Sequence, residues 1–270
     1  METFQLSEKL LKKIADLISA KKNTPLKKIV KDIHFADMAE IINELNEQQG
    51  IYLIKLFDSE KTSEILTELD EDVREKILKA LSVKEIADEI EELDSDDAAD
   101  ILGELSDERK EEVISEISDD NLADDLKELL SYEEDSAGGL MAKELVQANE
   151  NWSVTKCLKE IKKQGENVTR VHSIYVVDDK QKLIGRLSLK DLITSPAKNL
   201  IKDIYIPKVD SVNVYDDGEE VAKIMSKYDL EAIPVIDNKK QLVGRITIDD
   251  IVDFIKEEAE EDYLLAAGVQ

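Results

Sequence analysis

The side chains of this chain that can do chemistry are overwhelmingly carboxylates. Its 270 residues include 63 Asp and Glu against 36 Lys and Arg, which gives a formal net charge of −27 at pH 7. A surface of that sign repels nucleic-acid backbones and anionic membranes, and it attracts cations or basic partners. We therefore expect metal ions or positively charged groups as ligands, and no nucleic acid.

Nucleophilic and acid–base residues are few by comparison. The chain has two histidines, His34 and His172, which we expect to be structural or surface residues, and one cysteine, Cys157, which we expect to be a small, half-buried apolar residue. A single cysteine forms no internal disulfide, and neither a zinc-site spacing nor a common Gly-rich phosphate loop occurs. We therefore do not expect an enzyme.

A duplicated module in the second half positions a recurring pair of polar residues. Residues 174–193, IYVVDDKQKLIGRLSLKDLI, recur without a gap at 233–252 as IPVIDNKKQLVGRITIDDIV. Each copy predicts a strand, a turn, a strand and the start of a helix. Each also places a hydroxyl three residues before a carboxylate, and that spacing is equally typical of a helix cap. Two half-sized copies of one pattern are expected to bury their apolar faces against each other.

A shorter repeat organises the first half. Leu69, Leu81, Leu93, Leu105, Ile117 and Leu129 are each 12 residues apart, and a potential capping residue follows each of the first five: Asp70, Ser82, Asp94, Ser106 and Ser118. Ser82 and Glu85 have the spacing of a capping box. Helices of two to three turns are marginal alone, so the repeat predicts a stacked α-superhelix with an acidic exterior.

The paired glycines Gly138 and Gly139 end the helical pattern and mark the expected domain boundary. Beyond them we expect helices at 154–161, 219–227 and 249–267, the last amphipathic and crowded with like charges. No stretch approaches the ~18 apolar residues of a membrane span, and the N-terminus has no secretory signal. We expect a soluble, cytosolic chain.

The two units with the pattern Gly-Arg-x-[Ser/Thr]-x-x-Asp resemble a tandem pair of CBS (cystathionine-β-synthase) domains over about 142–256. Together with the helical repeats, YEEDSAGGLM at 132–141 and EAEED at 258–262, they resemble the cytosolic part of the MgtE magnesium channel family. The resemblance implies a multidomain α and α+β fold. Its expected parts are an acidic α-superhelical domain (1–130), a linker (131–141), CBS 1 (142–200), CBS 2 (201–256) and the start of an acidic helix (257–270). That helix would lead to a membrane pore that the chain lacks.

The same resemblance implies a function and a set of metal-binding carboxylates. In the family, the cytosolic region senses intracellular Mg²⁺, dimerises through the CBS pair and closes the pore of the same protein at the cytoplasmic face of the membrane. We expect the dimer contact on an exposed apolar helix face with Val221, Ile224 and Met225. Mg²⁺ prefers oxygen ligands and keeps several waters. The matching positions are Glu64, Asp96, Asp100, Asp217, Glu219, Asp229, Asp250, Asp253, Glu258, Glu261 and Asp262.

An alternative hypothesis is a stand-alone CBS module that senses ATP or another adenosine nucleotide and carries a helical scaffold arm. CBS relatives place a hydroxyl near phosphate and a carboxylate on the ribose hydroxyls, which here implies Ser188 with Asp191 and Thr247 with Asp250. Ser173 and Leu230 stand where some relatives have a base-stacking aromatic residue, and neither offers one. The two hypotheses differ in whether Mg²⁺ alone changes the domain arrangement.

Overall fold

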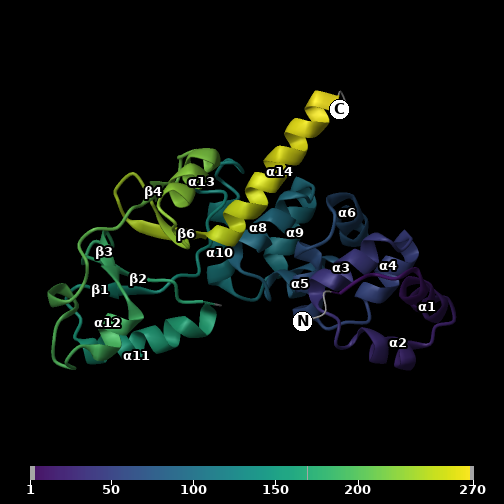
Figure 1. Cartoon of the computed structure of the whole chain (residues 1–270), viewed down its shortest axis with the longest axis horizontal. Coiled ribbons are helices and arrows are strands. Elements are labelled where there is room, and N and C mark those ends of the chain that lie inside the picture. The colour runs from purple at the N-terminus through teal and green to yellow at the C-terminus, as the bar shows by residue number, and fades with distance from the viewer. Residues whose placement is uncertain (1–3, 169, 268–270) are drawn as a thin grey trace. The chain divides into compact units, whose positions relative to one another are not determined.

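The computed structural model describes residues 4–168 and 170–267, and the chain divides into two compact units. The helical unit contains the chain up to Leu93 together with Asp97–Leu126 (Figure 1). The α+β unit contains Asp94–Asp96 together with the chain from Lys127 onward. Among the described residues, none of the helices combines the length and the apolar character needed to cross a bilayer.

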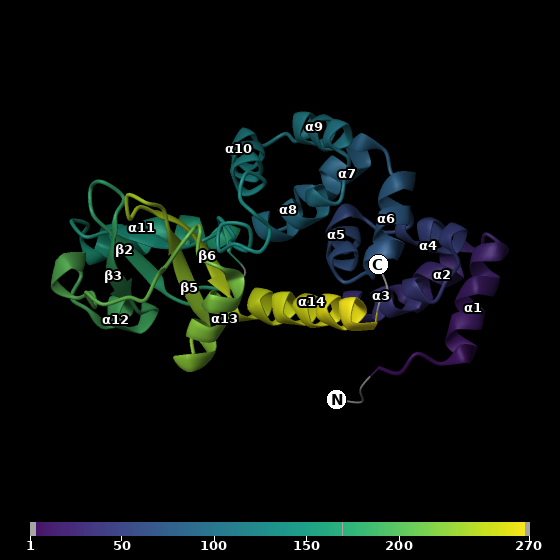
Figure 2. The ribbon, with the colours of Figure 1, turned by 90° about the horizontal axis from the view of Figure 1, so that it is seen from above.

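Short helices follow one another along a curve in the helical unit (Figure 2). Alternate helices pack together, α3 on α5, α5 on α7 and α7 on α9, which confirms the predicted stacking of the repeats. Their apolar edges form the core, in which Leu53, Leu66 and Ile86 are buried. The helices of the first half are α1 (Glu8–Ser19), α2 (Asn23–Val30), α3 (Phe35–Asn43), α4 (Glu47–Ile54), α5 (Ser59–Thr67), α6 (Glu71–Ala80), α7 (Val83–Ile90), α8 (Ser95–Gly103), α9 (Asp107–Glu116) and α10 (Asp120–Leu129).

The capping residues of the repeat are only partly as predicted: Asp70 and Ser106 occupy N-cap positions, but their side chains accept no capping hydrogen bond. The capping box at α7 is present: the Ser82 hydroxyl accepts from the Glu85 amide at 3.2 Å, and the Glu85 carboxylate accepts from the Ser82 amide at 2.7 Å. The prediction for Ser118 is wrong, because α10 begins two residues later and the Asp119 carboxylate accepts from the Asn121 amide at 2.9 Å. The Ser118 amide donates instead to the carboxylate of Glu91.

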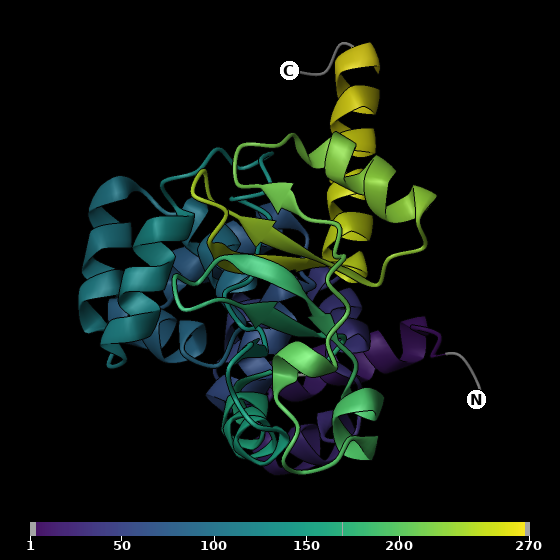
Figure 3. The ribbon, with the colours of Figure 1, turned by 90° about the vertical axis from the view of Figure 1, so that its left-hand side faces the viewer.

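Two three-stranded sheets lie side by side in the α+β unit (Figure 3). In each sheet the first strand pairs in parallel with the second, and the second pairs antiparallel with the third. The strands are β1 (Gln147–Asn149), β2 (Ile174–Val177) and β3 (Leu183–Leu187), then β4 (Val212–Asn213), β5 (Ala232–Ile236) and β6 (Leu242–Thr247). The helices are α11 (Val154–Gln164), α12 (Leu189–Thr194), α13 (Gly218–Lys227) and α14 (Ile248–Ala267), with 3-10 turns at Gly165–Asn167 and Ile201–Asp203.

The two copies exchange backbone segments, which explains the glycines of the repeated motif. Ala142, before β1, pairs with Arg245 in β6, and Ile206, before β4, pairs with Arg186 in β3. A Cβ at Gly185 would lie 2.4 Å from the Ile206 carbonyl oxygen, and one at Gly244 would lie 2.8 Å from that of Ala142. Glycine is therefore needed at both positions so that the partner segment can pass close to the strand.

The copies differ in the loop between their first helix and second strand. In the first copy, nine residues (165–173) separate α11 from β2, whereas four residues (228–231) separate α13 from β5 in the second copy. The two helices are consequently 64 residues apart, although the strands that follow them are 59 apart. This difference places five additional residues beside one sheet only.

The prediction that α13 exposes its apolar face is wrong. Val221 and Met225 are completely buried, because α13 turns its apolar edge toward the core of its own unit and packs against α14. Five of the exposed large apolar side chains lie on the helices that follow the third strand of each copy: Leu189 and Ile193 on α12, and Ile248, Val252 and Ile255 on α14. Pro234 lies within β5 and is buried.

Candidate metal and nucleotide sites

The predicted metal-binding residues of the first half lie on two helices. Glu64 is exposed on α5, close enough to Lys61 for an electrostatic interaction. Asp96 is half-buried and Asp100 is exposed, both on α8 and one helical turn apart, so their carboxylates project from the same helix face. These oxygens suit a hard cation such as Mg²⁺.

The predicted residues around α13 already have local partners. Asp217 is the N-cap of α13, and its carboxylate accepts from the amides of Glu219 at 2.9 Å and Glu220 at 3.3 Å. Glu219 forms an ion pair with Lys223 at 3.1 Å. Asp229 is exposed in the loop after α13, where its backbone has a φ of 50°. The structure therefore assigns Asp217 a capping role that is compatible with an additional ligand on its exposed side.

Asp250, at the start of α14, is one of the half-buried carboxylates among the predicted ligands. The Thr247 amide donates to its Oδ2 at 2.8 Å and the Thr247 hydroxyl donates to the same atom at 2.6 Å. Burial raises the pKa of Asp250 and the charge of Asp249 adds to that effect, whereas the bonds from Thr247 and the charge of Arg245 oppose it. Asp250 is therefore a carboxylate whose negative charge is costly without a nearby cation.

A second half-buried carboxylate, Asp94, lies within electrostatic range of Asp250 and was missed by the sequence reasoning. Burial raises the pKa of Asp94, and the neighbouring Glu144 carboxylate raises it further. The adjacent Ser95 is completely buried and donates through its hydroxyl to Glu144 Oε2 at 2.8 Å. The sequence predicted only a helix-capping role for Asp94, because no local sequence pattern indicates that Asp94 folds with the α+β unit.

The remaining predicted metal ligands lie along α14. Asp253 is exposed and forms an ion pair with Lys256 at 2.6 Å, and Glu258 is half-buried. The side chains of Glu261 and Asp262 lie outside the described residues. Within the described part of the chain, no three Asp, Glu, His or Cys side chains converge on a point that could hold a metal ion. The donor chemistry nevertheless fits Mg²⁺, which typically takes only one or two carboxylates and completes its shell with water.

The hydroxyl–carboxylate pairs of the two copies are helix caps in this structure. In the first copy, Ser188 Oγ donates to Asp191 Oδ2 at 2.7 Å and accepts from the Asp191 amide at 3.0 Å. In the second copy, Thr247 Oγ1 lies 2.8 Å from Asp249 Oδ1 and 2.6 Å from Asp250 Oδ2, so its single hydroxyl hydrogen can be donated to either carboxylate. A nucleotide hydroxyl or phosphate that used these groups would have to replace or share these bonds.

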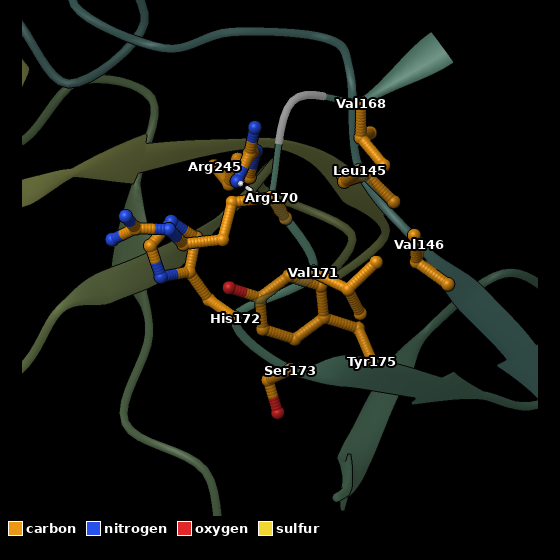
Figure 4. A pocket seen from close by; sticks show the side chains of 9 residues that line it. All are labelled: Leu145, Val146, Val168, Arg170, Val171, His172, Ser173, Tyr175 and Arg245. Atoms are coloured by element: carbon orange, nitrogen blue, oxygen red, sulfur yellow. Dashed lines mark hydrogen bonds between the residues drawn. The ribbon is translucent and has the colours of Figure 1, made fainter. Parts of the chain in front are cut away.

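A small cavity of about 10 Å³, which has room for roughly one water molecule, lies between the long loop of the first copy and strand β6 of the second (Figure 4). Ser173, which the sequence placed at a base-stacking position, lines it, and so do three residues to which the sequence reasoning gave no binding role: Arg170, His172 and Arg245. Arg245 is 5% exposed, and its guanidinium donates to the carbonyls of Glu144 and, at 3.4 Å, Arg170. The repeated Gly-Arg of the motif was the sequence signal that could have indicated Arg245 as a binding residue. It does not distinguish Arg245 from Arg186, because both copies contain it.

The helical unit consists of stacked short helices. It is followed by two copies of a module that pair backbone segments with each other and carry the motif Gly-Arg-x-[Ser/Thr]-x-x-Asp. These features define a helical domain followed by a CBS pair. The model of the MgtE intracellular N domain matches residues 33–135, and the model of the CBS domain matches 137–198 and 201–257. The chain belongs to the MgtE family.

Relatives and solved structures agree with this membership. The chain is 42% identical over 134 residues to the magnesium transporter MgtE of Thermus thermophilus, a match that covers 50% of this chain and 30% of that relative. The structure resembles the cytosolic domain of the Mg²⁺ channel MgtE in complex with ATP, with a TM-score of 0.82, 31% identity and coverage of 90% of this chain and 99% of that one. It also resembles the soluble part of a magnesium transporter, with a TM-score of 0.78, 29% identity and coverage of 93% and 99%. The match thus spans less than a third of the curated relative, and these closely similar relatives are named as transporters or channels, not enzymes.

Proposed function

We propose that this chain is the Mg²⁺-sensing, gating region of a magnesium transporter or channel, located at the cytoplasmic face of the cell membrane. Mg²⁺ would bridge acidic faces of the helical domain, CBS 2 and α14, and so favour a closed state of a pore domain in the same protein. The proposal is supported by family membership and carried by one observation: Asp250, at the start of α14, is a half-buried carboxylate whose pKa is raised by burial.

The interaction free energy between carboxylates and a bridging cation is large enough for such a switch. Two unit charges ~4 Å apart interact by about 4 kcal/mol at an effective dielectric constant near 20. Moving a two-state equilibrium from 1:99 to 99:1 takes about 5.5 kcal/mol of differential binding. Exchanging repulsion for bridging at two or three carboxylate pairs is therefore enough to shift the population of domain arrangements.

Small-angle scattering of the chain with and without millimolar Mg²⁺ tests this proposal. We expect the radius of gyration to fall with Mg²⁺ and to change much less in sodium chloride of matched ionic strength, because sodium screens charges without bridging them. Equal compaction in the two salts would show that screening alone is responsible.

A double variant locates the sensor. Asp96→Asn with Asp100→Asn removes two charges at constant size and should leave an arrangement that responds only weakly to Mg²⁺. Glu108→Gln with Glu111→Gln is the matched control, because both residues are exposed on α9 and outside the predicted site. The same Mg²⁺ response in both double variants would contradict a specific site and favour diffuse charge.

The chain is further proposed to form a homodimer through its CBS pair, on the apolar faces of α12 and α14. The pseudo-equivalent residues Ile193 and Val252 are 63% and 43% exposed, more than a buried core position allows. Covering such side chains removes apolar area from water. Ile193→Asp with Val252→Asp should produce a monomer in light scattering, whereas Tyr228→Asp, equally exposed but on the loop after α13, should remain dimeric. A dimeric double variant would exclude this face.

A second candidate function is the binding of ATP or another adenosine nucleotide between the two CBS copies. It is favoured by the similarity to the ATP complex described above. Calorimetric titration of ATP with the wild-type chain and with Ser188→Ala and Thr247→Val tests whether either hydroxyl–carboxylate pair takes part. Affinity that is unchanged in both variants would exclude these pairs as contacts.

A further inference from the structure

The first CBS copy carries a net positive charge in a strongly acidic chain. Residues 137–198 contain 11 Lys and Arg against 7 Asp and Glu, whereas residues 201–257 contain 8 against 13. The two copies share one fold, so the architecture does not require this difference in charge. The first copy is therefore the part of the chain whose surface can attract anions.

The positive charges of the first copy concentrate on helix α11. The helix buries Val154, Cys157 and Ile161 and packs through that edge on β1 and α12. Figure 1 shows α11 at the edge of the α+β unit. Its exposed face carries four lysines: Lys156, Lys159, Lys162 and Lys163. Because they follow one another at spacings of three or four residues, their side chains are neighbours on one helix face.

These lysines are only partly neutralised by the protein. The single carboxylate of α11 is that of Glu160, and its Oε2 lies 3.8 Å from Lys163 Nζ. Within the part of the chain that the structure describes, Lys159 and Lys162 form no ion pair. In the equivalent helix of the second copy, α13, Lys223 pairs with two glutamates of its own helix. The face of α11 thus retains a positive charge that α13 does not.

Stabilisation of the helix itself explains only two of the four lysines. Lys162 and Lys163 lie in the last turn, where cations interact favourably with the helix dipole. Lys156 lies in the first turn, where a cation is unfavourable, and Lys159 lies in the middle with a like charge four residues further on. Two positive charges therefore oppose helix formation unless an anionic surface faces them.

Apolar side chains accompany the lysines. Leu158 is 40% exposed and lies one turn before Lys162. Trp152, half-buried just before the helix, has its ring centre 4.8 Å from Lys156 Nζ. A lysine-rich helix face with an exposed leucine and an adjacent tryptophan is typical of segments that lie in the headgroup region of a bilayer.

We propose that the exposed face of α11 docks on anionic lipid headgroups of the cytoplasmic leaflet. The inference rests on the proposed location of the chain at the membrane. The net charge of −27 opposes the approach of the chain as a whole, but at about 0.1 M salt a charge acts over only about 10 Å. The surface that faces the bilayer therefore decides the sign of the interaction. Leu158 favours lipid over an acidic protein surface, because the headgroup region also accommodates apolar side chains.

Co-sedimentation of the chain with lipid vesicles tests the proposal. Vesicles of phosphatidylcholine mixed with phosphatidylglycerol are compared with phosphatidylcholine alone at about 0.1 M salt. EDTA is present so that Mg²⁺ does not bridge carboxylates to lipid phosphates. We expect binding to the anionic vesicles only, because the lysine face gains no electrostatic attraction from neutral lipid.

A pair of double variants assigns this binding to α11. Lys159→Gln with Lys162→Gln should weaken it about 25-fold, since each lysine near an anionic bilayer contributes about fivefold. Both side chains are exposed and glutamine is a good helix former, so the variant should remain folded. Lys223→Gln with Lys227→Gln on α13 removes the same charge from the other copy and should change the affinity less than about twofold.

Three results would overturn the proposal: no preference for anionic vesicles, equal losses in the two double variants, or binding that persists at about 1 M salt. Poly-glutamate is the alternative probe. If it binds through the α11 lysines while vesicles do not bind, the face serves an acidic protein partner and not a membrane. Compaction by Mg²⁺ is measured without lipid, so the absence of vesicle binding would leave the proposed sensing function intact.

Discussion

The two CBS copies share one motif but differ in how deeply they bury it. Arg186 and Arg245 occupy the same position in the repeated strand, yet Arg186 is exposed and Arg245 is 5% exposed. Likewise, Ser188 with Asp191 forms a cap near solvent, whereas Thr247 is 7% exposed and forms a hydrogen bond with the half-buried Asp250. The nine-residue loop beside Arg245 has only a four-residue counterpart in the other copy.

The difference shows that a duplicated sequence does not produce duplicated chemistry. The same guanidinium is a solvated charge in one copy and a structural donor beside a cavity in the other. Loop length decides between these outcomes, because the additional residues bring the Arg170 carbonyl to Arg245 and enclose the space around it.

The largest effect is expected at the paired arginines. Arg245→Met should lower the free energy of unfolding by about 3 kcal/mol, since it removes a buried guanidinium that donates to the carbonyls of Glu144 and Arg170. Arg186→Met should change it by less than about 0.5 kcal/mol. Urea denaturation of the two variants measures both values, and equal losses would mean that burial of Arg245 contributes nothing to the fold.

The paired hydroxyls should differ by a smaller amount. Thr247→Val keeps the shape of the side chain but removes the donor to Asp249 and Asp250, which should cost about 2 kcal/mol. Ser188→Ala removes the cap of a short, more exposed helix and should cost about 0.5–1 kcal/mol. Thermal denaturation of both variants ranks them, and the reverse order would refute the role assigned to burial.

Glu89 on α7 provides a reference carboxylate outside both copies. Burial raises its pKa to about 8, and its buried Oε2 makes no hydrogen bond. Because the folded pKa exceeds the unfolded one, its stabilising contribution is complete below about pH 4.5 and is lost as the pH rises through about 8. Glu89→Gln should therefore be about 1 kcal/mol more stable than wild type at pH 9 and nearly equal at pH 5, a modest value because the group is half-exposed. A difference that does not change with pH would contradict the shift.

Asp250→Asn should have the smallest effect. Burial raises the pKa of Asp250, but hydrogen bonds from Thr247 oppose the shift, unlike at Glu89. The wild-type chain should lose stability as the pH rises from the unfolded pKa of Asp through the raised folded value, and Asp250→Asn should flatten that part of the profile. Asp191→Asn, in the exposed pair, is the control. Parallel profiles for Asp250→Asn and the wild type would exclude Asp250 as a titrating group of the fold.

Much of the architecture was predictable from sequence because it depends on local pattern. The 12-residue leucine repeat and the Ser82 capping box specify short helices with one apolar edge, and the structure stacks them as expected. The 59-residue duplication specified strand, turn, strand and helix in both copies. The Ser118 cap was wrong because helix starts vary by a residue or two, and competing partners such as Glu91 decide them.

Burial, in contrast, was decided only by tertiary structure. The apolar residues Val221 and Met225 were equally compatible with an exposed dimer face and with the core, and the packing of α13 against α14 placed them in the core. Arg170, His172 and Arg245 are separated by up to 75 residues, so no spacing predicts that they share a cavity. The sequence by itself determined which residues are helical, extended or charged, because these are local properties. Which charges are desolvated depends on segments that meet only after folding, and the pKa shifts of Asp94 and Asp250 follow from that alone.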